Sequence, residues 1–175
     1  GLNTRDILLV RMHNKLDDSD MAFIVVHLPS KYGGGATAWK REKAASRLRE
    51  VADSVYNEGC HGIVVMGDFN DIPSARAFSR LEPLLFNASA QLAASGEGTI
   101  RFNGKWNLID MFWVTDEYRR KSLMHILKIP FLMVRDTKMA GEKPLRTYLG
   151  PRYVGGVSDH CPVVLEIYCR KKILL

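Results

Sequence analysis

The stretch GIVVMGDFNDIPS at residues 62–74 decides how the rest of the chain is interpreted. Its first five residues form a continuous apolar run, which is typical of a strand buried on both faces. The run leads directly into Asp68 and Asn70, which stand at the carboxyl end of the predicted strand. Functional groups in open α/β sheets collect at such strand ends. The stretch therefore predicts a central strand and one edge of a site, although DFND by itself is more often a simple turn.

The segments before this strand predict a hairpin and a helix. Apolar, β-branched runs at residues 6–12 and 21–26 are separated by a turn-forming segment rich in Asp and Asn. The second run ends in HLPSKYGGG, where the proline and the glycines stop the strand and leave His27 at its edge. From residue 37 to residue 56 the apolar side chains recur with helical spacing, which predicts an amphipathic helix.

The segments after it continue the alternation of helix and strand. The pattern predicts a short helix capped by Ser74, then strands at residues 106–114, 126–134 and 161–168, the second of them broken by a proline. Residues 136–156 are rich in glycine, proline and basic side chains and predict a long loop. Together these elements predict an α/β layered fold.

Composition restricts the class of protein but not its substrate. The 175 residues carry a net charge of +6, which suits a phosphate-bearing partner and equally suits a solvated basic surface. No apolar run approaches the roughly 18 residues that a membrane helix requires, so no membrane span is expected. The three cysteines, Cys60, Cys161 and Cys169, have no paired CxxC spacing, which argues against a zinc site or a disulfide framework.

Polar side chains interrupt or end the apolar segments at four places. These are His27, the pair Asp68 and Asn70, Asp110, and the adjacent Asp159 and His160. Carboxylates at one sheet edge can hold a hard divalent cation, and an imidazole can move protons beside it. Each cluster also has a structural explanation, such as a turn or a buried acid that satisfies backbone donors. Their co-occurrence in one short chain favours a site.

The order of these motifs resembles a known family. GDFND after an apolar strand, LID at residues 108–110, GGVSDHCPV at residues 155–163 and HLPSKYGG at residues 27–34 are similar to the signatures of the endonuclease/exonuclease/phosphatase superfamily. The similarity covers residues 6–168 and is greatest to bacterial members with an H-x-P-S-K/R-x-G-G pattern. It implies the C-terminal part of a four-layer α/β/β/α sandwich with mostly antiparallel sheets, as in deoxyribonuclease I. It also implies a hydrolase of phosphate esters, nuclease-like, that uses activated water.

The resemblance assigns roles to individual residues. Asp68 would activate the attacking water, Asn70 would steady it, and His160, oriented by Asp110, would act as base or as a charged clamp on the phosphate. Asp159 would help bind Mg²⁺, with Mn²⁺ as an alternative, and His27 would contact the phosphate. Substrate contacts are expected from Ser30, Lys31, Arg41 and Arg152. Arg146 could also meet phosphate, and each of these basic residues equally has an ordinary surface or packing explanation. The substrate stays open between DNA, RNA, a lipid head group and a small phosphate ester.

One family feature has no counterpart in this sequence. The family's principal metal ligand is a glutamate in an N-terminal half, and none of the eight glutamates here lies at a comparable strand end. Residues 1–175 are therefore expected to be the C-terminal part of a single domain, poorly active alone and prone to self-association. The alternative is a binding or scaffold protein that keeps the fold without catalysis. The sequence leaves a cytoplasmic or exported location equally open.

Overall fold

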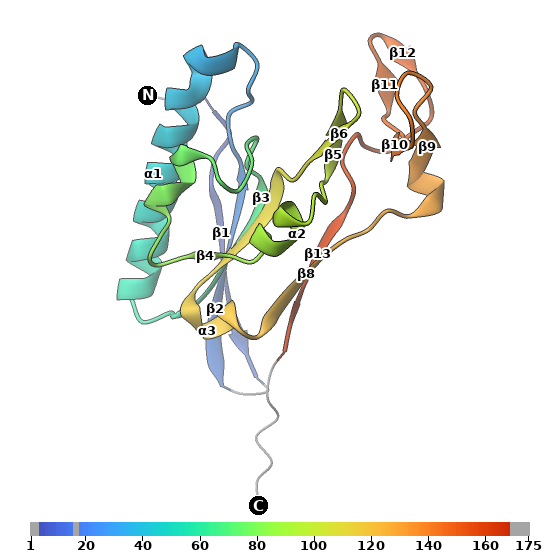
Figure 1. Cartoon of the computed structure of the whole chain (residues 1–175). Coiled ribbons are helices and arrows are strands. Elements are labelled where there is room, and N and C mark those ends of the chain that lie inside the picture. The colour runs from blue at the N-terminus through green and yellow to red at the C-terminus, as the bar shows by residue number, and fades with distance from the viewer. Residues whose placement is uncertain (1–3, 16–17, 169–175) are drawn as a thin grey trace, which may run out of the picture.

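A five-stranded sheet forms the centre of the computed structural model, which describes residues 4–15 and 18–168. Its strands run in the order β1 (Leu8–Asn14), β2 (Ser19–His27), β3 (Gly62–Asp68), β7 (Asp110–Val114) and β4 (Phe86–Asn87). The pair β2 and β3 is parallel, and the other neighbours are antiparallel. The predicted hairpin and the predicted central strand are both confirmed (Figure 1).

Helix α1 (Ala38–Asn57) covers one face of this sheet and connects β2 to β3 (Figure 1). Its buried stripe includes Ala45, Leu48 and Ala52, and it belongs to the same apolar cluster as Ile24 and Ile63 of the sheet. The helical spacing of apolar residues therefore predicted both the element and the side that it buries. Arg41 is the exception, a charged residue in the buried stripe.

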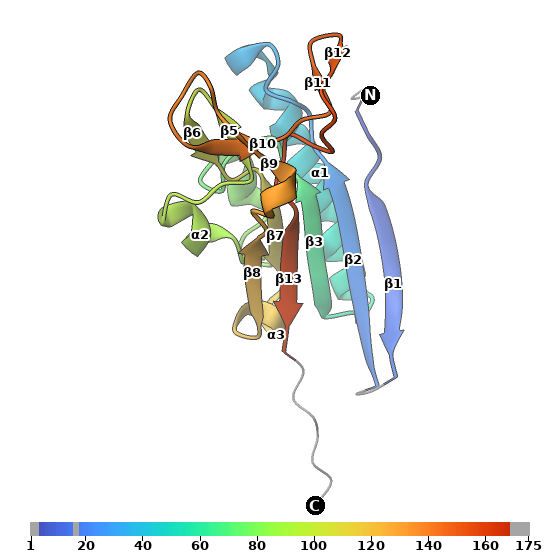
Figure 2. The ribbon, with the colours of Figure 1, turned by 90° about the vertical axis from the view of Figure 1, so that its right-hand side faces the viewer.

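A second pair of strands covers part of the opposite face. Strands β8 (Ser122–Ile126) and β13 (Val163–Ile167) are antiparallel and pack over β3 and β7 (Figure 2). The contact buries Val64, Phe112 and Met124. On the edge strand β1, by contrast, Leu8, Val10 and Met12 are exposed. This exposed apolar surface agrees with the expected self-association, which stays a prediction.

Short hairpins lie beyond the end of the sheet at which β2 and β3 finish (Figure 2). They are β5 (Ile100–Phe102) with β6 (Lys105–Asn107), β9 (Met133–Arg135) with β10 (Glu142–Pro144), and β11 (Tyr148–Leu149) with β12 (Arg152–Tyr153). The prediction of a structureless loop at residues 136–156 is therefore wrong, because three strands fall within it. The remaining short helices are η1 (Gly34–Thr37), η2 (Arg76–Arg80), α2 (Ala90–Ala94), α3 (Asp116–Arg119) and η3 (Pro130–Leu132).

Three predicted boundaries also need correction. The run at 106–114 is two strands, because the chain leaves β6 at Asn107 and begins β7 only at Asp110. The run at 126–134 is interrupted at Pro130 as predicted, but β8 already ends at Ile126 and β9 begins only at Met133, with η3 before it. Pro130 lacks an N–H for a sheet and suits a first helical turn. The predicted helix after Ser74 is the short η2, and its N-cap is Ala75.

Two negative expectations can be compared with the described residues. Among them, no helix is long and apolar enough to cross a membrane. Cys60 and Cys161 are buried free thiols, as the absence of paired spacing indicates, and Cys169 lies outside the described residues.

Replacing Gly67 with Ala is expected to destabilise the fold by roughly 3 kcal/mol or more. Gly67 directly precedes Asp68, its φ is +137°, and a Cβ there would lie 1.9 Å from the carbonyl oxygen of Val26. Gly59→Ala is the matched control, because Gly59 has a φ of +97° but open space around it. That variant should lose only about 1–2 kcal/mol. Equal losses in denaturant unfolding would show that close packing of β2 and β3 at Gly67 is unimportant.

Candidate active site

Three of the predicted site residues end or begin adjacent strands at one edge of the sheet. In the strand register His27 of β2 is opposite Asp68 of β3, and Asp68 is opposite Asp110 of β7. The arrangement follows from topology, because β2 and β3 are parallel and finish together, whereas the antiparallel β7 begins there. The predicted convergence of these strand ends is thus present in the structure.

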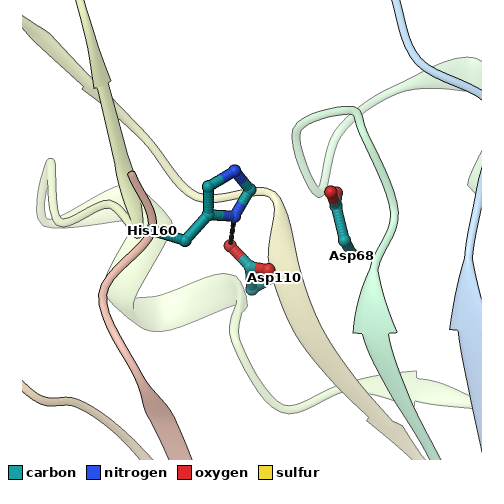
Figure 3. Close-up of side chains that lie close together, drawn as sticks. All are labelled: Asp68, Asp110 and His160. Atoms are coloured by element: carbon teal, nitrogen blue, oxygen red, sulfur yellow. Dashed lines mark hydrogen bonds and ion pairs between the residues drawn. The ribbon is translucent and has the colours of Figure 1, made fainter. Parts of the chain in front are cut away.

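His160 approaches the same edge from the segment before β13. Its Nδ1 lies 2.8 Å from Oδ2 of Asp110 (Figure 3). The hydrogen bond to Asp110 raises the pKa of His160 above its usual value, and the nearby charge of Asp68 acts in the same direction. Potential ligand atoms of Asp68, Asp110 and His160 all lie within 4.8 Å of one another. The edge therefore gathers two carboxylates and an imidazole that favours its charged form.

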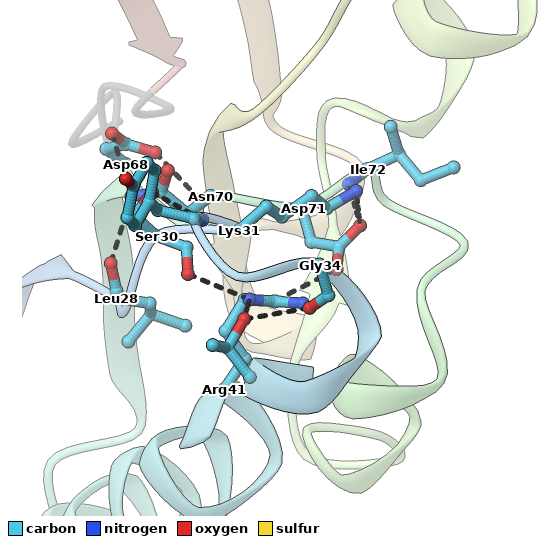
Figure 4. Close-up of polar contacts among 11 residues, drawn as sticks. Leu28, Ser30, Lys31, Gly34, Arg41, Asp68, Asn70, Asp71 and Ile72 are labelled. Carbon is cyan, nitrogen blue, oxygen red and sulfur yellow. Dashed lines mark hydrogen bonds and ion pairs between the residues drawn. The ribbon is translucent and has the colours of Figure 1, made fainter. Parts of the chain in front are cut away.

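Asp68 is held by its own turn. It accepts hydrogen bonds from the backbone N–H of Asn70 at 2.7 Å and from the side-chain amide of Asn70 at 3.2 Å. That amide also donates to the carbonyl oxygen of Leu28 at 2.9 Å, and Asn70 adopts a φ of 53° that Asn tolerates better than most residues (Figure 4). The turn interpretation of DFND is therefore confirmed, and the same turn holds Asp68 at the edge of the sheet.

Burial is the main influence on the Asp68 carboxyl. It raises the pKa of Asp68, the charge of Asp110 raises it further, and the backbone hydrogen bond from Asn70 opposes both. His27 contributes a weaker contact, with its Nε2 at 3.4 Å from Oδ2 of Asp68. Two carboxylates are thus held close together with incomplete compensation by positive charge.

Three of the predicted substrate contacts form a network around Asp71, beside this turn (Figure 4). Arg41, which is 4% exposed, donates to Asp71 at 3.1 Å and to the carbonyl oxygen of Ser30 at 3.1 Å. Lys31 forms an ion pair with the other oxygen of Asp71 at 2.5 Å. The side chain of Ser30 accepts from the backbone N–H of Tyr32 at 3.1 Å. The network fixes the loop that follows His27 against the loop that follows Asp68.

Asp159 and Arg152 lie outside the close group. Asp159 is about half exposed and pairs with Arg146 at 3.2 Å rather than with Asp68, Asp110 or His160. Arg152 is exposed on β12 and forms no ion pair or side-chain hydrogen bond with any residue that the structure describes. Arg146 thus contacts the residue that directly precedes His160, whereas Arg152 does not.

Thr99 is a site-supporting residue that no motif indicated. It is fully buried, and its Oγ1 accepts hydrogen bonds from the backbone N–H groups of Ile109 and Asp110, both at 3.3 Å. Its carbonyl oxygen accepts from the backbone N–H of Cys161 at 2.7 Å. One residue thus connects the start of β7 to the segment that carries His160. A lone threonine after a polar stretch carries no sequence signal for this role.

Thr99→Val is expected to destabilise the protein by roughly 1–3 kcal/mol, because it removes the acceptor of two partly buried N–H groups. It should also weaken the contact between Asp110 and His160 and so lower the pKa of His160, measured by NMR titration. Thr115→Val is the matched control, since Thr115 is equally buried and bonds to His61 and Ile63 at the opposite end of the sheet. A similar pKa change in both variants would contradict the proposed role of Thr99.

The comparison with protein families gives a match to the model described as the endonuclease/exonuclease/phosphatase family over residues 1–169. The chain belongs to this family. Comparison with curated protein sequences gives no significant match. Membership in the endonuclease/exonuclease/phosphatase family thus rests on almost the whole chain, and it confirms the family expected from the motifs.

Solved structures of family members share the fold at low sequence identity. The mannosyl-6-phosphatase Bt3783 of Bacteroides thetaiotaomicron VPI-5482 has a TM-score of 0.58 and 15% identity over 90% of this chain and 54% of that one. The 3' phosphatase NExo from Neisseria, bound to a product DNA hairpin, has a TM-score of 0.58 and 15% identity over 92% and 65%. Truncated TDP2 of Caenorhabditis elegans has a TM-score of 0.59 and 11% identity over 91% and 57%. The α/β, mostly antiparallel, deoxyribonuclease I-like fold is therefore confirmed, and the chain spans about half to two thirds of these relatives.

Proposed function

We propose that this protein takes part in metal-dependent hydrolysis of phosphate esters with water as the nucleophile. The observation that carries the proposal is the close group of Asp68, Asp110 and His160 at the sheet edge of a chain in this family. Phosphoryl transfer needs positioned charge more than covalent chemistry from the protein, and this group offers both signs of charge within a few ångströms. Proteins similar in fold include a mannosyl-6-phosphatase and a 3' phosphatase bound to a product DNA hairpin.

The donor set fits a hard divalent cation. Asp68 and Asp110 present carboxylate oxygens side by side, and the raised pKa of Asp68 reflects burial and the charge of Asp110. Oxygen-rich sites of this kind suit Mg²⁺ or Mn²⁺. Asp68 and Asp110 would hold the cation, with Asp159 as a further ligand once it leaves Arg146. A bound cation supplies neutralisation of phosphate charge and polarisation of a phosphoryl oxygen.

Each residue of the candidate site has its own role in the proposed reaction. Asp110 holds the imidazole of His160 so that its Nε2 is free to contact a phosphate oxygen or a water molecule. Asp68 orients the attacking water, and Asn70 fixes the orientation of Asp68 through two hydrogen bonds. His27, at the neighbouring strand end, contacts the phosphate and assists the leaving oxygen. Arg41 and Lys31, which pair with Asp71, support the loop carrying Ser30 and reach phosphate only by exchanging that partner.

The alternative of a non-catalytic binding protein has two supporting observations. Among the described residues, no glutamate joins the group of potential metal ligands, and the chain spans 54% of the sugar phosphatase to which it is similar. Metal binding and turnover therefore have to be measured separately.

The test combines Mn²⁺ binding, followed by calorimetry, with hydrolysis of bis(p-nitrophenyl) phosphate and of p-nitrophenyl phosphate. We expect the unmodified protein to bind Mn²⁺ and Asp68→Ala to lose that binding. We expect hydrolysis to require Mg²⁺ or Mn²⁺, to stop when EDTA is added, and to be lost in His160→Ala. Turnover should be low for residues 1–175 alone and higher in a longer natural protein that contains them. Absence of both metal binding and turnover in either form would overturn the proposal in favour of a binding protein.

A further inference from the structure

A pocket of about 460 Å³ lies beside the candidate active site, between the hairpin β5–β6 and the segment from β9 to β12. It adjoins the site through Asp159, which lines the pocket and directly precedes His160 in sequence. The hairpins that form its walls project beyond the sheet end that carries Asp68 and Asp110 (Figure 2). A substrate whose reacting phosphate sits at the group of Asp68, Asp110 and His160 can therefore extend into this pocket.

The lining of the pocket is strongly basic. It has five basic side chains and two carboxylates, which leaves an excess of three positive charges. The basic residues are Arg101, Arg135, Lys138, Lys143 and Arg146. A concave surface with one dominant sign of charge concentrates its field and attracts ligands of the opposite charge.

A buried ion-pair network makes the walls rigid. The side chains of Arg101 and Asp136 are only 9% and 8% exposed and lie 3.6 Å apart, and Lys143 contacts Asp136 at 3.0 Å. Arg101 also donates to the carbonyl oxygens of Gly104 and Glu142, both at 3.2 Å, and to that of Ala140. The network fastens β5–β6 to β9–β10, so the pocket is formed before a ligand arrives, which lowers the entropy cost of binding.

Two basic residues of the pocket are free to meet a ligand. Arg135 and Lys138 are exposed, and neither side chain has a carboxylate partner among the residues that the structure describes. Arg146, by contrast, is paired with Asp159, which also lines the pocket and directly precedes His160. The basic lining of the pocket thus includes Arg135 and Lys138, which are free, and Arg146, which is joined to the neighbour of His160.

The geometry points to a second anion site: we propose that this pocket binds another phosphate group of the same substrate. The inference rests on the proposed function, because it assigns the reacting phosphate to the group of Asp68, Asp110 and His160. Exposed Phe102 and Leu149 also line the pocket and would contact the carbon skeleton between the two phosphates. The substrate class is a compound with at least two phosphates, either a small bisphosphate or neighbouring phosphates of a nucleic-acid strand.

The test measures binding in EDTA, by calorimetry, so that it does not depend on turnover. One arm compares glucose 1,6-bisphosphate with glucose 6-phosphate, and the other compares the dinucleotide pTpT with the mononucleotide pT. The unmodified protein should bind the doubly phosphorylated member of at least one pair about tenfold more tightly, the effect of one or two charge-assisted hydrogen bonds. The arm that shows the preference identifies the source of the second phosphate.

The variant Arg135→Gln/Lys138→Gln should reduce that preference to about twofold or less, since it removes both free charges. Lys15→Gln/Arg120→Gln is the matched control, because it removes the same charge from exposed residues that do not line the pocket. A preference that survives in the pocket variant, or is absent from the unmodified protein in both arms, overturns the proposal. If the protein hydrolyses phosphate esters but does not prefer the doubly phosphorylated ligand, the second anion site is refuted and the proposed function stands. If it prefers that ligand but shows no metal-dependent hydrolysis, only the proposed function is refuted.

Discussion

Asp68→Asn is expected to abolish phosphate-ester hydrolysis, by about a thousandfold or more, while raising the thermal stability of the metal-free protein. Burial and the charge of Asp110 raise the pKa of Asp68, so the folded state disfavours the ionised carboxyl. The ionised carboxyl therefore destabilises the folded protein. This destabilisation has its full size above the folded-state pKa of Asp68 and disappears as the pH falls below the unfolded-state pKa. Asparagine removes the charge and still accepts the hydrogen bond from the backbone N–H of Asn70.

Thermal unfolding in EDTA at neutral pH checks this prediction. A gain of roughly 1 kcal/mol corresponds to an increase in Tm of about 2–4 °C for a chain of this size. Asp116→Asn, at an exposed carboxylate just beyond the opposite end of β7, should leave Tm unchanged. Added Mn²⁺ should raise the Tm of the unmodified protein but not that of Asp68→Asn, because a cation stabilises the state that binds it. Unchanged Tm in EDTA would mean that Asp68 is not held under electrostatic strain.

The central sheet and one edge of the site were predictable because both depend on local patterns. A continuous apolar run at residues 62–66 can form a stable strand only inside a sheet, and the polar residues after it must then lie at the sheet's end. His27 and Asp68 follow two such runs joined by a helix, which makes the strands parallel and brings both residues to the same edge. The helix α1 was predictable for the same reason, since its apolar spacing extends over several turns.

The three hairpins β5–β6, β9–β10 and β11–β12 were not predictable in this way. Each of their strands has two or three residues, too few for an alternating pattern to be recognised. Their positions depend on distant contacts such as the ion pair of Arg101 with Asp136, which joins residues far apart in sequence. Thr99 and Arg146 acquire their places from this arrangement. Before the fold was known, Arg146 was only one of several basic residues that could meet phosphate, and nothing indicated Thr99.

The partners of buried charges were equally inaccessible from the sequence. Helical spacing places Arg41 in the same buried stripe as Ala45 and Leu48, but no local pattern indicates what compensates its charge. Asp71, which lies thirty residues later in the chain, supplies that compensation. Sequence patterns identify which charges are present near a site, whereas tertiary pairing decides which of them are free to meet a substrate.

Asp110→Asn is expected to lower the pKa of His160 and to slow hydrolysis by about a hundredfold to ten thousandfold. The hydrogen bond that the ring of His160 donates to Asp110 is the largest influence that raises the pKa of His160, and it also fixes the orientation of the ring. A histidine whose pKa is higher in the folded than in the unfolded protein stabilises the folded state. This stabilisation is fully present below the unfolded-state pKa and is lost as the pH rises through the folded-state pKa. The variant should therefore lose more stability at about pH 6 than at about pH 9.

NMR titration of the His160 ring protons measures the pKa change directly and does not require turnover. A second histidine and carboxylate pair provides the control, because His125 lies 3.4 Å from Glu166 on β8 and β13. Glu166→Gln removes a comparable partner from a different imidazole and should leave both the titration of His160 and hydrolysis unchanged. If His160 titrates identically with and without the Asp110 carboxylate, their contact does not control the charge of the ring. The charged-clamp role of His160 would then have to depend on Asp68 and the bound phosphate instead.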